Sequence, residues 1–213
     1  MMASAVPDPW SCVRGLQPLS LCDWPGKVCL VLFLGGCNLR CPTCHNAQLA
    51  WRPETLPRIT REVVVSYCTT RGAWLDGIVI SGGEPSCVPG LEELCTDLAG
   101  IGLPLKLDSN GLRPYILNTL LAKGLLQAVA VDVKGPWEKY PALTGGRCSP
   151  DEARSALQLL FDRALQGEVE WFFRCTRVPA LSGDDIQKVR SALPAGHELT
   201  VQDFVPPAAQ AAI

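Results

Sequence analysis

The sequence predicts an α/β protein in which strands and helices alternate along nearly the whole chain. Six short segments are rich in apolar residues, and segments with apolar residues at helical spacing separate them. The first of the six is apolar throughout, which is typical of strands in a parallel sheet covered on both faces. The alternation predicts right-handed βαβ units. The sheet is either open and doubly wound or curved into an incomplete barrel, and periodicity does not separate the two.

The N-terminal part leads into the first strand. Residues 1–15 contain proline and are expected to form an irregular lead-in. Pro25 and Gly26 predict a turn, and the strand is expected from Val28 to Leu34, where seven apolar residues follow one another. The other strands are expected at residues 77–80, 103–107, 128–131, 169–176 and 198–204.

Helices are expected between these strands. Thr60 is a candidate N-cap for a helix over residues 60–70. Two further helices are expected over residues 90–98 and 114–123. The last helix is expected to begin at Ser182, with acidic residues in its first turn, and to end before Pro194.

One more helix is marked by the capping box Ser149-Pro150-Asp151-Glu152, in which proline occupies the first helical position. Apolar residues recur on one side of this helix, which predicts the face that packs on the sheet. They are Leu157, Leu160, Phe161 and Leu165.

The composition indicates one globular domain. A chain of 213 residues with 47% hydrophobic and 19% charged residues can bury a large core. We expect residues 16–205 to form this domain and residues 206–213 to form a loosely held tail. The net charge of −2 gives no reason to expect a nucleic acid or a membrane surface as a partner. The N-terminus lacks the pattern of a signal peptide, and no segment has the length of a membrane span, so a cytoplasmic location is expected.

Eleven cysteines are present, an odd number that does not favour a disulfide framework. Three of them lie in one short segment. The other eight stand at least seven positions apart, so they lack the spacing of a second cluster. We expect most of these eight to be small buried residues, including Cys29 and Cys175 in predicted strands.

The clustered cysteines, Cys37, Cys41 and Cys44, have the spacing C-x3-C-x2-C. Soft thiolates at such short spacing can bind zinc, copper(I) or an iron–sulfur cluster. A structural zinc site would use His45 as its fourth ligand. Three cysteines would instead leave one iron of a cubane cluster free to bind another ligand.

Further polar segments follow the predicted strands. Ser81-Gly82-Gly83-Glu84-Pro85 follows the second strand, Asp108-Ser109-Asn110-Gly111 the third, and Asp132-Val133-Lys134 the fourth. The carboxyl ends of parallel strands meet at one edge, where barrel enzymes place their active sites. We therefore expect these segments and the cysteine loop to surround one ligand.

Together these segments resemble the radical S-adenosylmethionine (SAM) superfamily. The Gly-Gly-Glu-Pro segment resembles a motif of the superfamily. The cysteine spacing followed by His45-Asn46, the Asp108-Ser109-Asn110-Gly111 segment and the Asp-x-Lys segment resemble in particular the activating enzymes of anaerobic glycyl-radical enzymes, such as those of pyruvate formate-lyase. Asp23-Trp24-Pro25-Gly26-Lys27 is most similar to anaerobic ribonucleotide reductase activating proteins. The resemblance spans about Leu16 to Phe204 and implies a partial (β/α)6 TIM-like barrel that is open on one side.

The resemblance also implies roles for the candidate residues. The three cysteines would hold a [4Fe–4S] cluster, and the Gly82-Gly83 backbone would meet the amino group of SAM. Lys134 would reach the SAM carboxylate. The remaining candidates would hold the cofactor or its loops. In some family members the acid and hydroxyl at the positions of Asp108 and Ser109 help to hold a monovalent cation, and Asp132 would lie beside this cation or the ribose of SAM. These candidates are Thr43, His45, Asn46, Glu84, Asp108, Ser109, Asp132 and, more weakly, Arg174.

The implied activity is a radical reaction. A reduced cluster would cleave SAM to a 5′-deoxyadenosyl radical, which would remove a hydrogen atom from a glycine of a partner glycyl-radical enzyme. A flavodoxin- or ferredoxin-type protein would supply the electron. The alternatives are a radical SAM enzyme acting on a small molecule, as in 7-carboxy-7-deazaguanine synthase, radical modification of another protein residue, and a noncatalytic zinc-binding module. Thr43 stands where many members carry an aromatic residue, so the packing of adenine is not specified.

Overall fold

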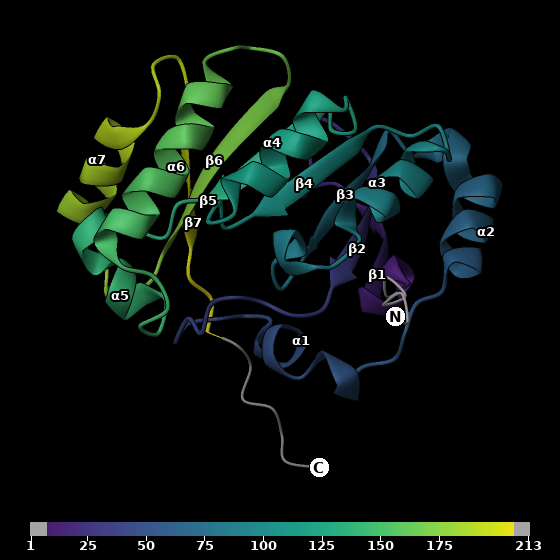
Figure 1. Ribbon diagram of the computed structural model, residues 1–213, viewed down its shortest axis with the longest axis horizontal. Helices are drawn as coiled ribbons and strands as arrows, with labels where there is room; N and C mark the ends of the chain where they lie inside the picture. The colour runs from purple at the N-terminus through teal and green to yellow at the C-terminus, as the bar shows by residue number, and fades with distance from the viewer. Residues whose placement is uncertain (1–7, 207–213) are drawn as a thin grey trace, which may run out of the picture.

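The computed structural model describes residues 8–206, which form one seven-stranded sheet with helices packed on it (Figure 1). Residues 1–7 of the expected lead-in and residues 207–213 of the expected tail lie outside the described residues. The strands are β1 (Val13–Ser20), β2 (Cys29–Leu34), β3 (Gly77–Gly82), β4 (Leu105–Ser109), β5 (Ala128–Asp132), β6 (Glu170–Arg177) and β7 (Leu199–Asp203).

The sheet follows the chain, with the strand order β1-β2-β3-β4-β5-β6-β7. The strands β2 to β7 are parallel to their neighbours, whereas β1 is antiparallel to β2. A doubly wound sheet would reverse its strand order at a switch point. Because the order never reverses here and β1 and β7 lie at opposite edges, the sheet is an incomplete barrel. The predicted open barrel with six parallel strands is confirmed.

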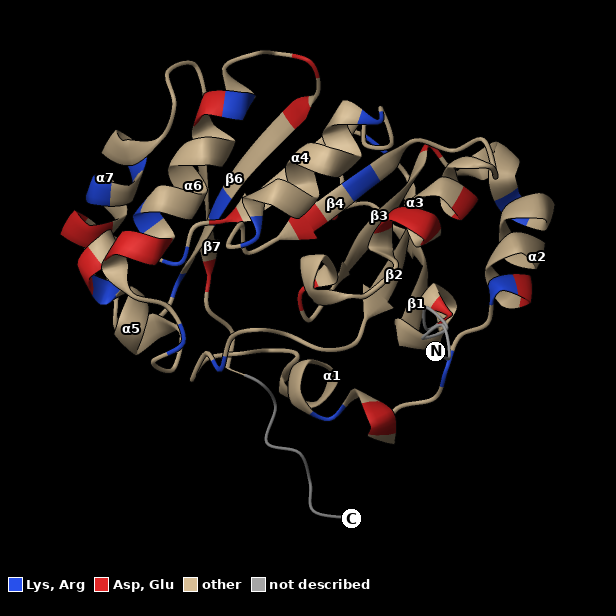
Figure 2. Cartoon of the chain, viewed as in Figure 1, with Lys and Arg blue, Asp and Glu red and all other residues tan. Residues whose placement is uncertain are grey.

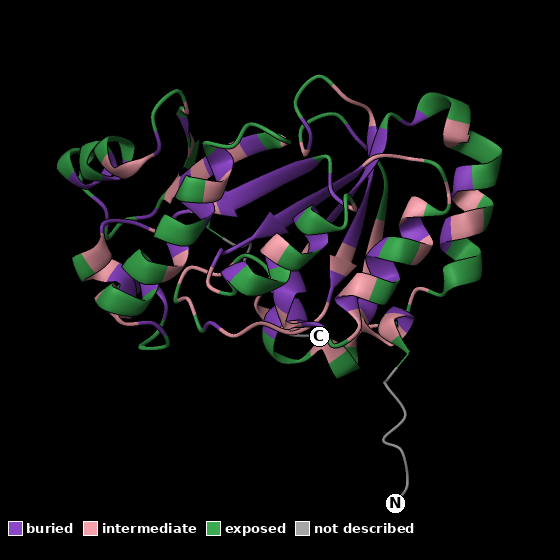
Figure 3. Ribbon diagram, turned by 45° about the horizontal axis from the view of Figure 1, so that its top comes forward, coloured by how far each residue is buried: buried purple, intermediate pink, exposed green. Residues whose placement is uncertain are grey.

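Helices follow the parallel strands β2 to β6 on the outside of the sheet, with exposed outer surfaces over buried strands (Figures 1 and 3). The α-helices are α1 (Ala47–Trp51), α2 (Arg61–Arg71), α3 (Leu91–Ala99), α4 (Pro114–Ala122), α5 (Tyr140–Leu143), α6 (Pro150–Ala164) and α7 (Gly183–Ala192). Short 3-10 turns lie at Pro9–Cys12, Pro53–Thr55, Gly72–Trp74, Pro85–Cys87 and Trp137–Lys139. Among the described residues, no helix combines the length and the apolar character needed to cross a membrane.

The main error of the sequence prediction concerns β1. Residues 13–15 were expected in an irregular lead-in, but they begin this edge strand. The strand shows no regular alternation of buried and exposed residues, and it contains Gly15 and Pro18. Proline is tolerated on an edge strand because one side of it makes no ladder hydrogen bonds. The strand therefore lacks the pattern by which strands are recognised in a sequence.

The predicted helix starts hold, with small differences in detail. The capping boxes at Ser149 and Ser182 are both formed. Thr60 lies at the N-cap of α2, but its side chain makes no capping hydrogen bond. Leu165 was expected on the apolar face of α6, yet it lies beyond the helix end and is 58% exposed. The strand expected at residues 103–107 begins two residues later, at Leu105. Cys29 and Cys175 are buried as expected.

The inner face of the sheet is filled at one end only. A large apolar core lies between the sheet and the helices, and a second, small core contains Trp24, Cys29, Val31, Val79 and Ala128. Most of this small core lies toward the N-terminal ends of the strands. Trp24 is 1% exposed, and its indole Nε1 donates to Glu170 Oε2 at 2.9 Å, at the start of β6. Trp24 thus fills the lower end of the barrel, where the parallel strands begin. The upper end, where these strands end, is left for polar groups.

A cysteine-lined cavity at the carboxyl ends of the strands

A cavity of about 380 Å³ lies at the carboxyl ends of the strands. Its volume falls in the range of small-molecule and cofactor sites. All the candidate residues line it, although they come from five separate segments. They are Cys37, Cys41, Thr43, Cys44, His45, Asn46, Gly82, Gly83, Glu84, Asp108, Ser109, Asp132, Lys134 and Arg174. The folding of a parallel sheet therefore gathers them at one edge.

The loop that carries the three cysteines is held in place by hydrogen bonds from several sides. Arg40 N donates to Thr144 O at 3.1 Å, and Trp51 Nε1 donates to Leu39 O at 3.1 Å. Asn46 Nδ2 donates to Gly82 O at 3.4 Å, which links the loop to the Gly-Gly segment. The expectation that Asn46 shapes this loop is consistent with that bond. The thiols are thus presented by a braced loop.

Burial acts on the thiols themselves. It raises the pKa of Cys37 to about 12, and it also raises the pKa of Cys41, an effect that the nearby ammonium of Lys134 opposes. Without a bound metal, both side chains are therefore neutral thiols near pH 7. Metal binding would displace their protons, since the thiolate is the ligand.

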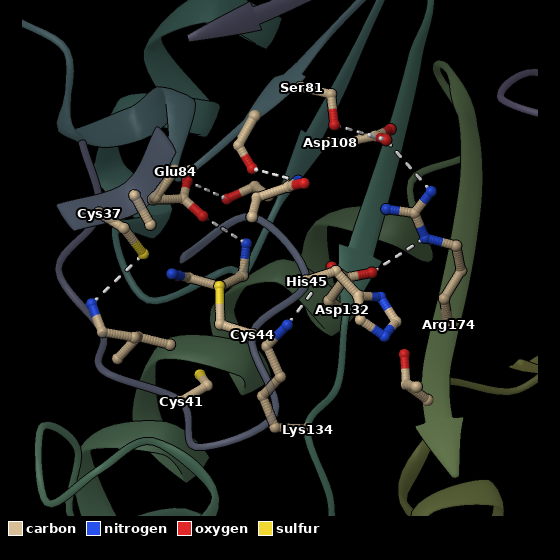
Figure 4. Close-up of a pocket in the computed structure, with 18 of the residues that line it drawn as sticks. Cys37, Cys41, Cys44, His45, Ser81, Glu84, Asp108, Asp132, Lys134 and Arg174 are labelled. Atoms are coloured by element: carbon tan, nitrogen blue, oxygen red, sulfur yellow. Dashed lines mark hydrogen bonds and ion pairs between the residues drawn. The ribbon is translucent and has the colours of Figure 1, made fainter. Parts of the chain in front are cut away.

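The arrangement of the thiols bears on which metal they suit. Figure 4 shows all three cysteines on the side of the cavity formed by the loop. Within residues 8–206, no three His, Cys, Asp or Glu side chains lie close enough together to hold a single metal ion. The His45 ring is stacked on Phe204, with ring centroids 5.2 Å apart. Thiolates of a cubane bind different irons and need not converge on one ion, so three soft donors around one cavity fit an iron–sulfur cluster.

Gly82 and Gly83 allow two strand ends to pack closely. Gly82 has φ of +127°, and a Cβ there would lie 2.4 Å from Leu34 N. A Cβ on Gly83 would lie 2.1 Å from Gly36 O. The glycines therefore let the end of β3 fit against the end of β2 and against Gly36, which follows β2. Packing of the protein backbone thus requires glycine here, in addition to any approach of a ligand.

Glu84 joins two of the loops around the cavity. Its carboxylate is 1% exposed and accepts four hydrogen bonds. Ser86 donates from its backbone N at 3.1 Å and from its Oγ at 2.6 Å. Ser109 Oγ and Asn110 N donate from the loop after β4 at 2.7 Å and 2.6 Å. Burial raises the pKa of Glu84, and these hydrogen bonds lower it in part. The expected role of Glu84 in holding a loop agrees with this geometry.

Replacing Glu84 with glutamine is expected to destabilise the protein even without cofactors. The amide nitrogen would face the backbone N–H of Ser86 or Asn110 and leave a buried donor unpaired, at a cost of about 1–3 kcal/mol. Chemical denaturation of the metal-free protein measures this loss. Glu92→Gln is the control, because Glu92 is a partly exposed residue paired with Lys123. Equal stability of the two variants would contradict the role assigned to Glu84.

Charged side chains form a connected network of ion pairs on the side of the cavity opposite the cysteine loop (Figure 4). Arg174 in β6 donates from Nε to Asp132 Oδ1 at 2.9 Å and from one terminal nitrogen to Asp108 Oδ2 at 3.1 Å. The buried ammonium of Lys106 pairs with Asp108 Oδ1. Lys134 Nζ lies 3.4 Å from Asp132 Oδ2. Burial favours the neutral form of Asp132, but Lys134 and Arg174 outweigh it and lower the pKa to about 2.

The monovalent cation suggested for the two aspartates does not fit this arrangement. Each carboxylate oxygen of Asp108 and Asp132 already accepts from a cationic nitrogen. A metal ion would have to displace one of these nitrogens and stand beside the remaining positive charges.

Sequence reasoning missed several residues of the site. The sequence pattern predicts Lys106 in a strand and indicates no role for it, although a lysine inside an apolar segment is a usable signal. Arg174 was only a weak candidate, because its partners are 42 and 66 residues away. Asn110 donates from Nδ2 to Asn38 Oδ1 at 2.9 Å and so ties the loop after β4 to the cysteine loop. Phe204 contacts the site through His45.

Comparison with known proteins identifies the family. The family model described as the radical SAM superfamily matches residues 31–191. The chain belongs to the radical SAM superfamily. A provisionally assigned glycyl-radical enzyme activating enzyme of Methanocaldococcus jannaschii is 30% identical to this radical SAM protein over 199 residues, which are 91% of this chain and 80% of that relative.

Two further relatives match shorter parts of this radical SAM protein. The pyruvate formate-lyase-activating enzyme of Staphylococcus aureus is 31% identical over 103 residues, 46% of this chain and 41% of the relative. The 7-carboxy-7-deazaguanine synthase of Synechocystis is 35% identical over 92 residues, 43% of this chain and 42% of the relative. The structure of Streptococcus suis SuiB bound to precursor peptide SuiA superposes with a TM-score of 0.62 at 15% identity, covering 82% of this chain and 39% of SuiB. The superposition shows that the fold is shared.

Membership of the family establishes the type of protein. It is a radical SAM enzyme of the oxidoreductase class, with a [4Fe–4S] cluster and SAM as cofactors and with homology to glycyl-radical enzyme activases. The donor set agrees with these cofactors, because three thiols face ammonium and guanidinium groups across one cavity. The sequence-based prediction of the superfamily is confirmed.

Proposed function

We propose that this radical SAM enzyme is an activase that removes a hydrogen atom from a glycine of a partner glycyl-radical enzyme. The similarity to the Methanocaldococcus jannaschii relative carries this proposal, since it extends over 91% of this chain and 80% of that relative. When bound, the reduced cluster and SAM supply a 5′-deoxyadenosyl radical, which takes the hydrogen from the glycine Cα and becomes 5′-deoxyadenosine. The chain itself binds these cofactors, orients them and limits the access of water.

The residues that line the cavity would divide this work. Cys37, Cys41 and Cys44 would bind three irons of the cluster, leaving the fourth for SAM. Lys134 would bind the carboxylate of SAM, because its ammonium lines the cavity and lies next to Asp132. The backbone of Gly82 and Gly83 would receive the amino group. Thr43, His45, Glu84, Asp108, Ser109 and Asp132 would hold the loops and the cofactors in position.

The partner that we propose is an anaerobic ribonucleotide reductase or a related glycyl-radical enzyme, with a flavodoxin- or ferredoxin-type protein as the electron donor. The segment Asp23-Trp24-Pro25-Gly26-Lys27 supports this choice by its similarity to the activating proteins of that branch. Within the segment, Asp23 lines the cavity, whereas Trp24 belongs to the small core below it.

Electron paramagnetic resonance tests the proposal directly. The anaerobically reconstituted and reduced protein is incubated with SAM and each glycyl-radical enzyme encoded in the same genome. The expected result is the doublet signal of a glycyl radical, together with 5′-deoxyadenosine in equal amount. Cleavage of SAM without a glycyl signal from any partner would contradict activase function.

The second candidate function is a reaction on a small molecule. The 35% identity to 7-carboxy-7-deazaguanine synthase favours it, but over only 43% of this chain. Incubation with the substrate of that synthase in place of a partner protein distinguishes the two functions. A substrate-dependent burst of 5′-deoxyadenosine and formation of the carboxylated deazaguanine would support the small-molecule reaction.

Lys134→Gln tests the proposed contact with SAM. Loss of a charge-assisted hydrogen bond of about 1.5–3 kcal/mol is expected to weaken SAM binding by about 10- to 100-fold. Equilibrium dialysis of the reconstituted protein measures this affinity. The matched control is Lys139→Gln, since Lys139 pairs with Asp185 away from the cavity. Unchanged affinity in Lys134→Gln would remove this residue from the SAM site.

A further inference from the structure

The two aspartates on the charged side of the cavity lie on neighbouring strands and are paired with protein cations. Asp108 and Asp132 end the neighbouring strands β4 and β5, and Arg174 lies on the next strand, β6. The guanidinium of Arg174 reaches both carboxylates, at 2.9 Å and 3.1 Å. It thus lies between two carboxylates from adjacent strands, where a small cation would otherwise bind.

The remaining oxygens of the two carboxylates are also paired. Lys106 pairs with Asp108 Oδ1. Asp108 Oδ2, which Arg174 contacts, also accepts from Ser81 Oγ at 3.3 Å. Lys134 Nζ lies 3.4 Å from Asp132 Oδ2, which is farther than the 2.9 Å between Arg174 Nε and Asp132 Oδ1. Three cations face two carboxylates in this network, so it retains one unbalanced positive charge. The loosely paired Lys134 is the group that can offer this charge to an incoming carboxylate.

We propose that Arg174 is a built-in cation of the SAM site, which takes the place of a monovalent metal ion between Asp108 and Asp132. By neutralising Asp132, it leaves Lys134 free to bind the carboxylate of SAM. SAM binding by this enzyme is therefore independent of Na⁺ and K⁺. Arg174 acts through its neighbours and is a positioning residue. The proposal rests on SAM binding in this cavity and does not depend on which molecule donates hydrogen.

A rigid guanidinium suits this position better than an ammonium. Its planar set of N–H donors can bond two carboxylates at once, whereas lysine is a single point charge on a flexible chain. Arg174 has 17% of its side chain exposed, so most of the group is shielded from solvent. Its two carboxylate partners raise its pKa further despite burial, and the charge is permanent.

SAM affinity in different salts tests the wild-type protein. The reconstituted enzyme is dialysed against SAM in NaCl, KCl or tetramethylammonium chloride at the same ionic strength. The dissociation constant is expected to agree within about two-fold in all three, because exposed charges are screened alike at equal ionic strength. Binding that is ten-fold or more tighter in Na⁺ or K⁺ would overturn the proposal. This assay contains no partner protein, so its outcome is separate from that of the glycyl-radical experiment.

Arg174→Gln tests the residue itself. In tetramethylammonium chloride this variant is expected to bind SAM about ten-fold more weakly or worse, because Lys134 turns to the uncompensated Asp132. Added K⁺ or Na⁺ is expected to restore part of the affinity. The proposal would be overturned if this variant bound SAM as tightly as the wild type does. It would also be overturned if neither K⁺ nor Na⁺ restored any of the lost SAM affinity. The matched control is Arg177→Gln on the same strand, whose side chain is 56% exposed and pairs with an exposed carboxylate at 3.8 Å.

Arg174→Lys provides a second variant in case Arg174→Gln does not fold. It keeps the charge but cannot bridge both carboxylates. Its SAM affinity is expected to fall between those of wild type and Arg174→Gln and to stay independent of Na⁺ and K⁺. If Arg174→Lys bound SAM ten-fold more tightly in Na⁺ or K⁺ than in tetramethylammonium chloride, the proposal would be contradicted. Circular dichroism and unfolding curves of all variants establish that the compared proteins are folded.

Discussion

Replacing Cys41 with alanine is expected to abolish cluster assembly and, with it, reductive cleavage of SAM. Each thiolate of a cubane binds one iron, so the variant would retain ligands for only two of the four irons. Among residues 8–206, no cysteine other than Cys37, Cys41 and Cys44 lines the cavity, so no other thiol can replace Cys41 as the third ligand. Iron and sulfide analysis after anaerobic reconstitution, together with the yield of 5′-deoxyadenosine, measures the effect.

The control for this substitution is Cys68→Ala. Cys68 is buried in α2 and does not line the cavity, so its loss leaves every proposed cluster ligand in place. This variant is expected to bind iron and to cleave SAM as the wild type does. Full cluster content and undiminished 5′-deoxyadenosine formation in Cys41→Ala would show that the cluster is held elsewhere.

Replacing Trp24 with alanine is expected to cause the largest loss of stability. The variant would lose a fully buried indole that fills the lower end of the barrel, and also its hydrogen bond to Glu170. Truncation of a buried tryptophan costs about 3–5 kcal/mol. For a protein of this size, the melting temperature would fall by roughly 2–4 °C for each kcal/mol. Denaturant titration and thermal unfolding of the metal-free protein measure the change.

Trp74→Ala is the matched control, because Trp74 is 76% exposed. A surface substitution of this kind is expected to change the free energy of unfolding by no more than about 0.5 kcal/mol. Similar stabilities of Trp24→Ala and Trp74→Ala would mean that the lower end of the barrel tolerates a cavity. The small core around Trp24 would then contribute little to the fold.

The parallel strands and the gathering of the site were predictable from sequence, for a physical reason. Strands that are buried on both faces consist of consecutive apolar residues, and the polar residues that follow them must lie at one edge. The edge strand β1 gave no such signal, since only part of it is buried and it contains Gly15 and Pro18. Local pattern also marked the capping box at Ser149 and the helix start at Ser182, because these interactions span only a few residues.

The charged network could not be predicted in the same way. The contacts of Arg174 with Asp108 and Asp132 depend on the order and register of β4, β5 and β6. Nothing in the neighbourhood of Arg174 in the chain indicates these partners. The stacking of Phe204 on His45 likewise joins the end of the last strand to the first loop of the site. Such contacts become visible only when the sheet is assembled.

The strand order has a consequence for how the protein is made. Each parallel strand bonds to the strand synthesised just before it, so the sheet can grow by addition at one edge as the chain leaves the ribosome. Arg174 and Phe204 are synthesised long after the cysteine loop, so the contacts of Arg174 with Asp132 and of Phe204 with His45 can form only after that loop has been made.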